Sequence, residues 1–335
     1  MKKARILICI LLVLTLLIFS FSACNKEETI TKVKLNEVTH SIFYAPQYVA
    51  MNEGLFEEEG LEIELTNGAG ADKVLTAVIS GDADIGFCGP EATLYVYNGN
   101  KDDYVVTFAQ LTKRDGSFLL AREPDENFTF EKVIGKDIIG GRKGGMPEMS
   151  LEWVLKQHDI IPGEDVNVDT SIQFAAMAGA FKGGTGDYVA LFEPTALAME
   201  KEGAGYVVAS IGVESGEVPY TCYNAKKSFI DANPDLIQKF TNAVYKGLMW
   251  VQNHTPEEIA AVIQDQFPDT DLDDLTAVVK RYKDQDTWSL NPVLTEESFE
   301  HMQDIVEEAG ELDVRTPYDA LVDSSFANEA VDTIK

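Results

Sequence analysis

Residues 60–89 read GLEIELTNGAGADKVLTAVISGDADIGFCG, and their apolar residues follow two different spacings. In residues 61–65 apolar and polar residues alternate, which is typical of a strand with one buried face. In residues 74–79 the apolar residues fall on one face of a helix that ends at Gly81. Alternation returns in residues 83–87. The segment therefore predicts a strand, a helix and a second strand, as in an α/β protein.

A similar arrangement recurs further along the chain. Residues 136–160 combine an apolar strand, a glycine-rich turn and a helix, and we interpret them as the start of a second lobe. The C-terminal part is mostly helical, with a helix start at Asn233-Pro234 and a capping box at Thr255-Pro256-Glu257-Glu258. Short irregular breaks occur at Arg122-Glu123-Pro124 and Val218-Pro219-Tyr220. We expect the chain to cross between two lobes at these breaks.

The N-terminus, MKKARILICILLVLTLLIFSFSAC, places basic residues before an apolar run of about 16 residues. A helix that spans a bilayer normally needs about 20 apolar residues, so we expect a cleaved secretory signal over residues 1–23. Phe21-Ser22-Ala23-Cys24 resembles the bacterial lipobox, with Phe21 where Leu is usual. This resemblance implies that Cys24 carries a diacylglycerol thioether and that residues 24–32 form a polar tether. An ordinary secreted cysteine is the alternative.

The charge of the chain restricts its partners. The net charge is −29, and because residues 1–23 contain three basic residues and no acidic one, their removal would change it to −32. Nucleic acid is excluded as a partner, since binding phosphates requires a basic surface. An anionic membrane would also repel this surface, so any membrane association has to come from the lipid alone.

Residues suited to metal binding or catalysis are sparse. Beyond residue 24 only Cys88 and Cys222 remain, which is enough for one disulfide, and the four histidines are scattered without the spacing of metal ligands. The sequence lacks the GxSxG, P-loop, dinucleotide-binding and HExxH patterns. We therefore expect no metal, no cofactor and no catalytic residue. A binding role becomes the better interpretation.

Two stretches of the N-terminal half resemble a family of binding proteins. They are THSIFYAPQYVAMNEGLFEEEGLEIELTNGAG, residues 39–70, and AVISGDADIGFCGPEATL, residues 77–94. They are similar to the substrate-binding proteins of ABC transporters of the nitrate, sulfonate and taurine group, which includes binders of thiamine pyrimidine precursors. The specific parts are three short motifs, which run from Tyr44 to Ala50, from Gly54 to Leu61 and from Gly81 to Gly86. Weaker similarity extends over most of the remaining chain.

The resemblance implies a two-lobed α/β fold of the type II periplasmic-binding-protein kind, with the ligand in a cleft between the lobes. We expect residues 33–121 to form the first part of lobe 1, residues 122–219 to form lobe 2, and residues 220–335 to form the second, mostly helical part of lobe 1. Open α/β sheets bind ligands at the carboxyl ends of their strands. The contact residues are therefore expected in the loops that follow the strands.

In lobe 1, His40, Tyr44 and Gln47 follow the first strand, and Tyr44 can stack on a ring while His40 can hydrogen-bond a ligand. Gly89-Pro90-Glu91 follows a strand and opens the next helix, so its backbone N–H groups can meet a polar ligand atom. Each prediction has a structural alternative. Tyr44 can be a helix-capping aromatic, His40 a satisfied loop histidine, and Gly89-Pro90-Glu91 a plain strand-to-helix turn.

In lobe 2, Gly144-Gly145-Met146-Pro147 occupies the equivalent place, and Glu193 follows an apolar strand. Met146 offers apolar surface where sulfonate-type relatives carry hydroxyl residues, which counts against an anionic ligand. The carboxylate of Glu193 would repel a sulfonate but can pair with an amino-pyrimidine edge or a cation. An exposed glutamate at a helix start is the alternative. Arg114 and Arg142 lie near strand ends and leave an anionic ligand open.

These observations predict a lipid-anchored extracytoplasmic protein, expected to be a monomer, that captures a small-molecule solute and delivers it to an ABC permease. We expect a nitrogen heterocycle as ligand, such as a thiamine pyrimidine precursor or a related vitamin. A small anion, such as an alkanesulfonate, taurine or nitrate, is the alternative. An enzyme resembling the pyrimidine synthases built on this fold is a more distant alternative, because the chain lacks their cysteine-rich motif. A surface sensor or adhesin without an importer is another.

Overall fold

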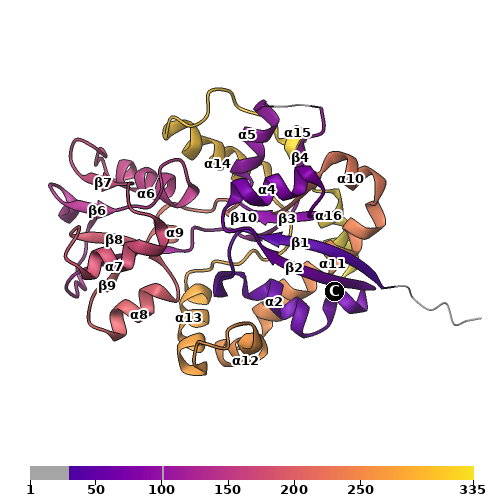
Figure 1. Ribbon diagram of the computed structural model, residues 1–335, viewed down its shortest axis with the longest axis horizontal. Coiled ribbons are helices and arrows are strands. Elements are labelled where there is room, and N and C mark those ends of the chain that lie inside the picture. The colour runs from indigo at the N-terminus through magenta and orange to yellow at the C-terminus, as the bar shows by residue number, and fades with distance from the viewer. Residues whose placement is uncertain (1–29, 100–101) are drawn as a thin grey trace, which may run out of the picture. The chain divides into compact units, whose positions relative to one another are not determined.

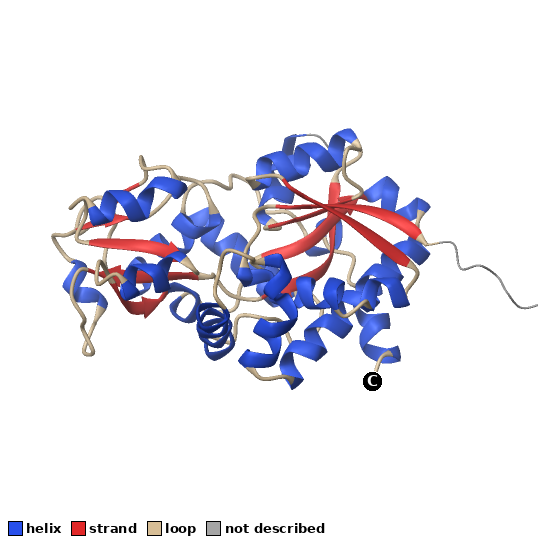
Figure 2. Ribbon diagram, turned by 60° about the horizontal axis from the view of Figure 1, so that its bottom comes forward, coloured by secondary structure: helices blue, strands red, loops and turns tan. Residues whose placement is uncertain are grey.

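The computed structural model describes residues 30–99 and 102–335, so the expected signal peptide and Cys24 lie outside the described residues. The described strands form two five-stranded sheets, which appear in Figures 1 and 2 as two groups. The first sheet has the order β2-β1-β3-β10-β4 and consists of β1 (Thr31–Glu37), β2 (Leu61–Asn67), β3 (Ile85–Cys88), β4 (Val105–Thr112) and β10 (Thr221–Lys226). The second has the order β7-β6-β8-β5-β9 and consists of β5 (Ser117–Ala121), β6 (Asp137–Ile139), β7 (Asn167–Asp169), β8 (Tyr188–Phe192) and β9 (Tyr206–Ser210).

Strand directions bring the loops that carry the predicted contact residues to one edge of each sheet. In the first sheet β1 is parallel to β3, and β10 is antiparallel to both β3 and β4. The carboxyl ends of β1, β3 and β4 therefore share an edge with the start of β10. In the second sheet β6 is parallel to β7 and β8, while β5 is antiparallel to β8 and β9. The carboxyl ends of β6, β8 and β9 share an edge with the start of β5.

The chain passes between the sheets twice, each time from these edges. Residues 113–116 connect β4 to β5, and residues 211–220 connect β9 to β10. The expected break at Val218-Pro219-Tyr220 lies in the second crossover. The first crossover comes earlier than predicted, because Ser117–Ala121 pairs with β8 and β9 and so belongs to lobe 2. The boundary predicted at residues 121 and 122 is thus wrong, and Arg122-Glu123-Pro124 lies inside lobe 2.

Helices cover the faces of both sheets (Figure 1). The helices before the first crossover are η1 (Ile42–Tyr44), α2 (Ala45–Asn52), α3 (Leu55–Glu58), α4 (Ala71–Ser80) and α5 (Glu91–Gly99). Lobe 2 and the second crossover contain η2 (Phe130–Val133), α6 (Met146–Gln157), η3 (Phe174–Ala176), α7 (Met177–Lys182), α8 (Thr195–Lys201) and α9 (Ile211–Glu214). After β10 come α10 (Lys227–Ala232), α11 (Pro234–Asn253), α12 (Pro256–Ile263), η4 (Gln264–Gln266), α13 (Leu272–Asp284), α14 (Glu296–Glu308), α15 (Tyr318–Leu321) and α16 (Ser325–Thr333). Within residues 30–99 and 102–335, no helix combines the length and apolar character needed to cross a membrane.

Several local predictions are confirmed. The strand, helix and strand of residues 60–89 are β2, α4 and β3, and α4 ends at Gly81. Helix α11 starts at Pro234 and packs against α2, α3 and α16. One face of the helix is fully or almost fully buried and includes Ile237, Phe240, Val244, Leu248 and Val251. The capping box is formed by Thr255 and Glu258 at the start of α12. These features stabilise lobe 1 and position the loops at its carboxyl edge.

Cys88 and Cys222 lie directly opposite each other on the adjacent strands β3 and β10. Both are free thiols with no exposed surface. Burial raises the pKa of each thiol well above its usual value. The disulfide that the sequence allows is therefore not formed in this structure, and both residues act as small apolar side chains within the first sheet.

Candidate functional site

Five polar side chains gather where the two crossovers meet the carboxyl edges of the sheets. We call them the interlobe polar cluster: Tyr44, Glu91, Asp115, Ser150 and Tyr220. Each is at most 8% exposed. Tyr44 and Glu91 belong to lobe 1, Ser150 lies in α6 of lobe 2, and the other two lie one in each crossover. Burial raises the pKa of the Tyr220 hydroxyl well above its usual value, and the nearby Asp115 and Glu91 raise it further. Tyr220 is thus a common neighbour of both carboxyl groups.

Glu91 opens α5 directly after β3, and its carboxyl group folds back over Gly89. A Cβ atom at Gly89 would lie 2.0 Å from Glu91 Oε2, so the glycine makes room for this conformation. Oε2 is buried and has no hydrogen-bond partner among the described residues. Burial raises the pKa of Glu91 to about 7, while its own backbone N–H opposes this shift. A buried carboxylate oxygen without a donor is costly, and a ligand N–H group or cation would satisfy it.

Asp115 lies in the first crossover and has no exposed surface. Its Oδ1 atom accepts hydrogen bonds from the backbone N–H of Ser117 at 2.6 Å and from the Ser117 hydroxyl at 2.5 Å. Its backbone carbonyl accepts a bond from Gln285 Nε2 at 2.6 Å. The other carboxyl oxygen, Oδ2, has no hydrogen-bond partner in the described part of the chain. Burial raises the pKa of Asp115 to about 6, against the lowering effect of Ser117.

The hydroxyl groups of Ser150 and Tyr220 lie next to the Asp115 carboxyl group, and both oppose the rise of its pKa. Neither hydroxyl oxygen makes a hydrogen bond of acceptable geometry with any residue that the structure describes. Tyr44 is 4% exposed and packs its ring edge-on against Phe87, with 4.6 Å between ring centroids. Lobe 1, lobe 2 and both crossovers therefore each contribute a polar group to one buried region.

Aromatic rings from both lobes border this cluster. Phe43 of lobe 1 meets Phe192 of lobe 2 edge-on at 6.0 Å between centroids and meets Tyr220 edge-on at 5.8 Å. Gly116 of the first crossover lies against both phenylalanine rings. A Cβ atom at Gly116 would lie 2.6 Å from Phe43 Cε2 and 2.8 Å from Phe192 Cε1. The two lobes therefore contact each other through the rings of Phe43 and Phe192, which both pack against Gly116.

Two predicted contact residues belong instead to a network around Glu37. His40 Nδ1 lies 2.8 Å from Glu37 Oε1, and its Nε2 lies 2.9 Å from the Gln266 carbonyl oxygen. Gln47 is fully buried, donates to Glu37 Oε2 at 3.0 Å and accepts from the Tyr223 hydroxyl at 3.1 Å. The bond to Glu37 raises the pKa of His40. Both side chains therefore have protein partners, which is the structural alternative stated for His40.

Glu193 forms an ion pair across the lobes. One carboxyl oxygen pairs with the guanidinium group of Arg281 on α13, and the other accepts a bond from the Leu197 backbone N–H at 2.9 Å. Arg281 also reaches Glu200 Oε2 at 2.5 Å. The Glu193 side chain has no exposed surface, and burial raises its pKa although Arg281 lowers it. Unlike Glu91, Glu193 therefore has a partner for each oxygen, and it is not the exposed glutamate of the alternative interpretation.

The turn Gly144-Gly145-Met146-Pro147 lies where it was expected, at the start of α6. Met146 is 3% exposed and belongs to the hydrophobic core, and Gly144 donates its backbone N–H to Glu148 Oε2 at 3.0 Å. Ser150 follows Met146 by four residues and so lies on the same face of the helix. The turn therefore aims an apolar and a hydroxyl side chain in one direction.

Arg114 and Arg142, the two arginines that could bind an anionic ligand, lie in different environments. Arg114 Nη2 lies 3.7 Å from both Glu217 and Asp286, and Lys113 also pairs with these two acids. Arg142 is exposed in the turn before α6. The positive charge of Arg114 is thus partly neutralised by neighbouring carboxylates, and Arg142 is exposed to solvent.

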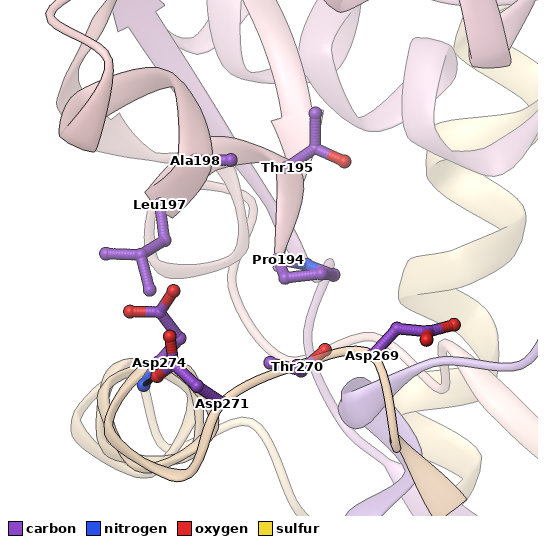
Figure 3. A pocket seen from close by; sticks show the side chains of 8 residues that line it. All are labelled: Pro194, Thr195, Leu197, Ala198, Asp269, Thr270, Asp271 and Asp274. Atoms are coloured by element: carbon purple, nitrogen blue, oxygen red, sulfur yellow. Dashed lines mark hydrogen bonds between the residues drawn. The ribbon is translucent and has the colours of Figure 1, made fainter.

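A separate hollow of about 290 Å³ lies between the start of α8 and the loop that leads into α13 (Figure 3). Its lining residues are Pro194, Thr195, Leu197, Ala198, Asp269, Thr270, Asp271 and Asp274. Asp274 pairs with Lys201 at 2.6 Å, and Asp271 accepts the Asp274 backbone N–H at 2.8 Å. The hollow thus lies outside the interlobe polar cluster, and these two acids already have protein partners. Across residues 30–99 and 102–335, no group of three or more His, Cys, Asp or Glu side chains is placed to hold a metal ion.

Of the interlobe polar cluster, Tyr44 and Glu91 were predicted contact residues, whereas Asp115, Ser150 and Tyr220 were not. Asp115 stands in a short polar segment between two apolar runs, a pattern that is also typical of a turn within one sheet. Tyr220 was recognised only as part of a lobe break. No local pattern marks Ser150, because its position depends on how α6 packs against the crossovers.

Two α/β lobes, two crossovers and a buried polar cluster between them define the periplasmic-binding-protein class of fold (type II). The alkanesulfonate-binding protein SsuA of Xanthomonas axonopodis pv. citri, bound to MOPS, superimposes with a TM-score of 0.69 over 88% of this chain and 99% of its own, at 16% identity. A family profile described as NMT1/THI5 like matches residues 42–259. The chain belongs to this NMT1/THI5-like family.

Two relatives in sequence differ in how much of the chain they match. YtlA of Bacillus subtilis (strain 168), whose assigned name proposes a binding protein, is 47% identical over 313 residues, which are 93% of this chain and 94% of YtlA. The 4-amino-5-hydroxymethyl-2-methylpyrimidine phosphate synthase of Aspergillus parasiticus is 24% identical over 231 residues, which are 62% of this chain and 63% of the synthase. The more similar relative is thus named for binding, and the more distant one for synthesis of a pyrimidine.

Proposed function

We propose that this protein is the lipid-anchored, extracytoplasmic solute-binding protein of an ABC importer. Its ligand is a nitrogen heterocycle with N–H donors or a positive charge, such as a thiamine pyrimidine precursor. The observation that carries the proposal is the buried carboxyl group of Glu91, whose Oε2 atom no described residue bonds. An anion placed beside this carboxylate in a region of low dielectric would be repelled. A donor or cation would be attracted and would relieve the cost of burying the oxygen.

The relatives support this class of function. YtlA is named as a binder and matches nearly the whole length of this chain. The pyrimidine in the name of the fungal synthase is an amino-substituted nitrogen heterocycle, which is the ligand chemistry that a buried carboxylate recognises. Catalysis is not part of the proposal, because solute capture requires only the lobes and the site between them.

The roles of the predicted contact residues follow from their partners. Glu91 takes the recognition role first assigned to Glu193, because Glu193 already pairs with Arg281. Tyr44 and Met146 provide the walls of the site from lobe 1 and lobe 2, and Gly89-Pro90 shapes the turn beneath Glu91. His40 and Gln47 act indirectly, because their bonds to Glu37 fix the loop that carries Tyr44.

Capture would proceed by closure of the two lobes on the ligand. Residues from both lobes and both crossovers surround the same buried region, so the ligand makes its full set of contacts only in the closed arrangement. A ligand shifts such an equilibrium by its differential affinity for the two arrangements. The closed, loaded form would then be presented to the permease.

Calorimetric titration and thermal shift of the purified protein test the proposal. The panel contains 4-amino-5-hydroxymethyl-2-methylpyrimidine, thiamine, riboflavin, taurine, an alkanesulfonate and nitrate. A ligand at 100 times its Kd should add about 2.7 kcal/mol of stability. We expect a heterocycle to bind and the anions to produce neither binding heat nor a thermal shift. Binding of an anion without binding of any heterocycle would refute the proposed ligand class.

The role of Glu91 is tested by replacing it with Gln. The variant should bind the heterocycle about 10- to 100-fold more weakly, the range for a hydrogen bond to a charged group. Glu257→Gln is the matched control, because Glu257 also stands in the first turn of a helix but is exposed. Equal affinities for the two variants and the wild type would refute the role of Glu91.

A further inference from the structure

Three buried oxygen atoms lie together between the crossovers and α6: Asp115 Oδ2, Ser150 Oγ and Tyr220 OH. The two hydroxyl groups lie close enough to the Asp115 carboxyl group to lower its pKa, but none of the three atoms makes a hydrogen bond of acceptable geometry. Their lack of partners holds for the residues that the structure describes. Native proteins leave few buried polar groups without a well-formed hydrogen bond. The two hydroxyl donors stabilise the carboxylate, yet the fold leaves all three oxygens without well-formed bonds, so a ligand edge placed among them would complete their hydrogen bonding.

The local turn around Asp115 does not by itself explain the unpartnered oxygen. The same Asp-x-Ser turn occurs at Asp169, whose Oδ1 accepts bonds from the backbone N–H and hydroxyl of Ser171 at 2.9 and 2.6 Å. Asp169 is partly exposed, so solvent can satisfy its other oxygen, and its pKa is lowered by Ser171. Asp115 has no exposed surface and a raised pKa. The two turns share one geometry and differ in burial.

We propose that Asp115, Ser150 and Tyr220 form a second recognition point of the ligand site, located at the hinge and distinct from Glu91, which binds an amino-substituted edge of a nitrogen heterocycle. This inference rests on the proposed function and extends it. The carboxylate of Asp115 accepts from an exocyclic N–H group. The hydroxyls of Ser150 and Tyr220 donate to the neighbouring ring nitrogen or accept a further N–H bond.

The fixed position of Asp115 favours this role. Its Oδ1 is held by two bonds from Ser117, and its backbone carbonyl is held by Gln285. Gly212 packs against the same carbonyl, since a Cβ atom there would lie 2.0 Å from it. Oδ2 is therefore presented by a carboxyl group that cannot turn away without losing several contacts. Groups held in advance in this way bind a ligand with little loss of conformational entropy.

The recognition point also links ligand binding to the arrangement of the lobes. Asp115 and Tyr220 belong to the two crossovers, while Ser150 belongs to α6 of lobe 2. A ligand held by Asp115 and Tyr220 therefore gains its bond to Ser150 only when lobe 2 is closed. Ligands that lack an amino-substituted edge would lose both this bond and the contribution it makes to closure.

The test measures the affinity of the purified full-length protein for 4-amino-5-hydroxymethyl-2-methylpyrimidine and for its analogue with oxygen in place of the 4-amino group. The wild type should bind the amino compound at least 10-fold more tightly. Asp115→Asn should weaken the amino compound about 10- to 100-fold and remove most of the preference. Ser150→Ala and Tyr220→Phe should each weaken it several-fold. Asp169→Asn is the matched control and should bind both compounds as the wild type does.

A urea titration of each ligand-free variant excludes misfolding as the cause. Asp115→Asn keeps the Oδ1 acceptor for Ser117 and removes a buried charge, so its unfolding midpoint should not fall. A loss of affinity at unchanged or higher stability is a result that a purely structural aspartate would not produce. If Asp115→Asn binds like the wild type while Glu91→Gln binds weakly, the second recognition point is refuted and the proposed function stands. If the wild type binds neither pyrimidine, the proposed ligand class and this inference both fail.

Discussion

The ion pair between Arg281 and Glu193 connects the two lobes, and replacing Arg281 with Met isolates a carboxylate that has no exposed surface. Removing one partner of a buried pair costs about 3–5 kcal/mol of unfolding free energy. The Arg281 side chain is 27% exposed, so water replaces part of the interaction, and we expect a loss near the lower limit, about 3 kcal/mol. Arg315→Met is the control, because Arg315 pairs with exposed carboxylates and such pairs contribute about 1 kcal/mol or less.

The assay is a urea titration followed by circular dichroism at pH 7 and pH 5. Burial already raises the pKa of Glu193 above its unfolded value of 4.5, and loss of Arg281 raises it further. A group whose pKa is raised in the folded state destabilises that state as the pH rises above the unfolded pKa. The loss in Arg281→Met should therefore be smaller at pH 5 than at pH 7, and Glu193→Gln in the same chain should restore most of it. A loss no larger than that of Arg315→Met, or one that does not change with pH, would refute the isolated carboxylate.

Three further predictions concern other parts of the molecule. Glu91 has a pKa of about 7 in the folded state and 4.5 in the unfolded state. Its carboxylate therefore destabilises the folded protein increasingly as the pH rises from 4.5 to 7. In urea titrations, Glu91→Gln should be more stable than the wild type by about 3 kcal/mol at pH 8, and its unfolding free energy should depend less on pH. Affinity for a cationic heterocycle should rise with pH through 7 in the wild type but not in this variant. Cys24→Ala should release the protein into the medium or leave it uncleaved, as followed by cell fractionation, and normal membrane retention with removal of the signal would contradict lipidation. Cys88 and Cys222 should resist thiol reagents in the native protein and react in urea, because neither has exposed surface, and rapid labelling of the native protein would show that the first sheet opens.

The strands and helices that follow a strict apolar spacing could be predicted from the sequence. Residues 60–89 fold as expected because local spacing alone determines which face each side chain presents. The first crossover could not be located in this way. The apolar spacing of Ser117–Ala121 predicts a strand, but it does not show which of the two sheets the strand joins. Its partner β8 lies about 70 residues further along the chain, and no local signal reveals that pairing.

The candidate site shows the same division. Glu91 was predicted from its place after a strand, which is a local property. The partner of Glu193 is Arg281, 88 positions away, so the sequence could not show that this carboxylate is already paired. Asp115 and Tyr220 become neighbours only because the two crossovers leave the same edge of the first sheet, a consequence of strand order that residue spacing does not encode.

Gly116 determines how closely the two lobes can approach each other. Because the rings of Phe43 and Phe192 leave no room for a Cβ atom there, a single methyl group at this position would act as a wedge between the lobes. A Gly116→Ala variant would keep every proposed ligand-contact residue, but its two lobes could not close fully. In the proposed function, this variant would still bind the solute. It would not deliver the solute to a permease that recognises only the closed form. In the proposed function, closure of the lobes therefore requires glycine at position 116.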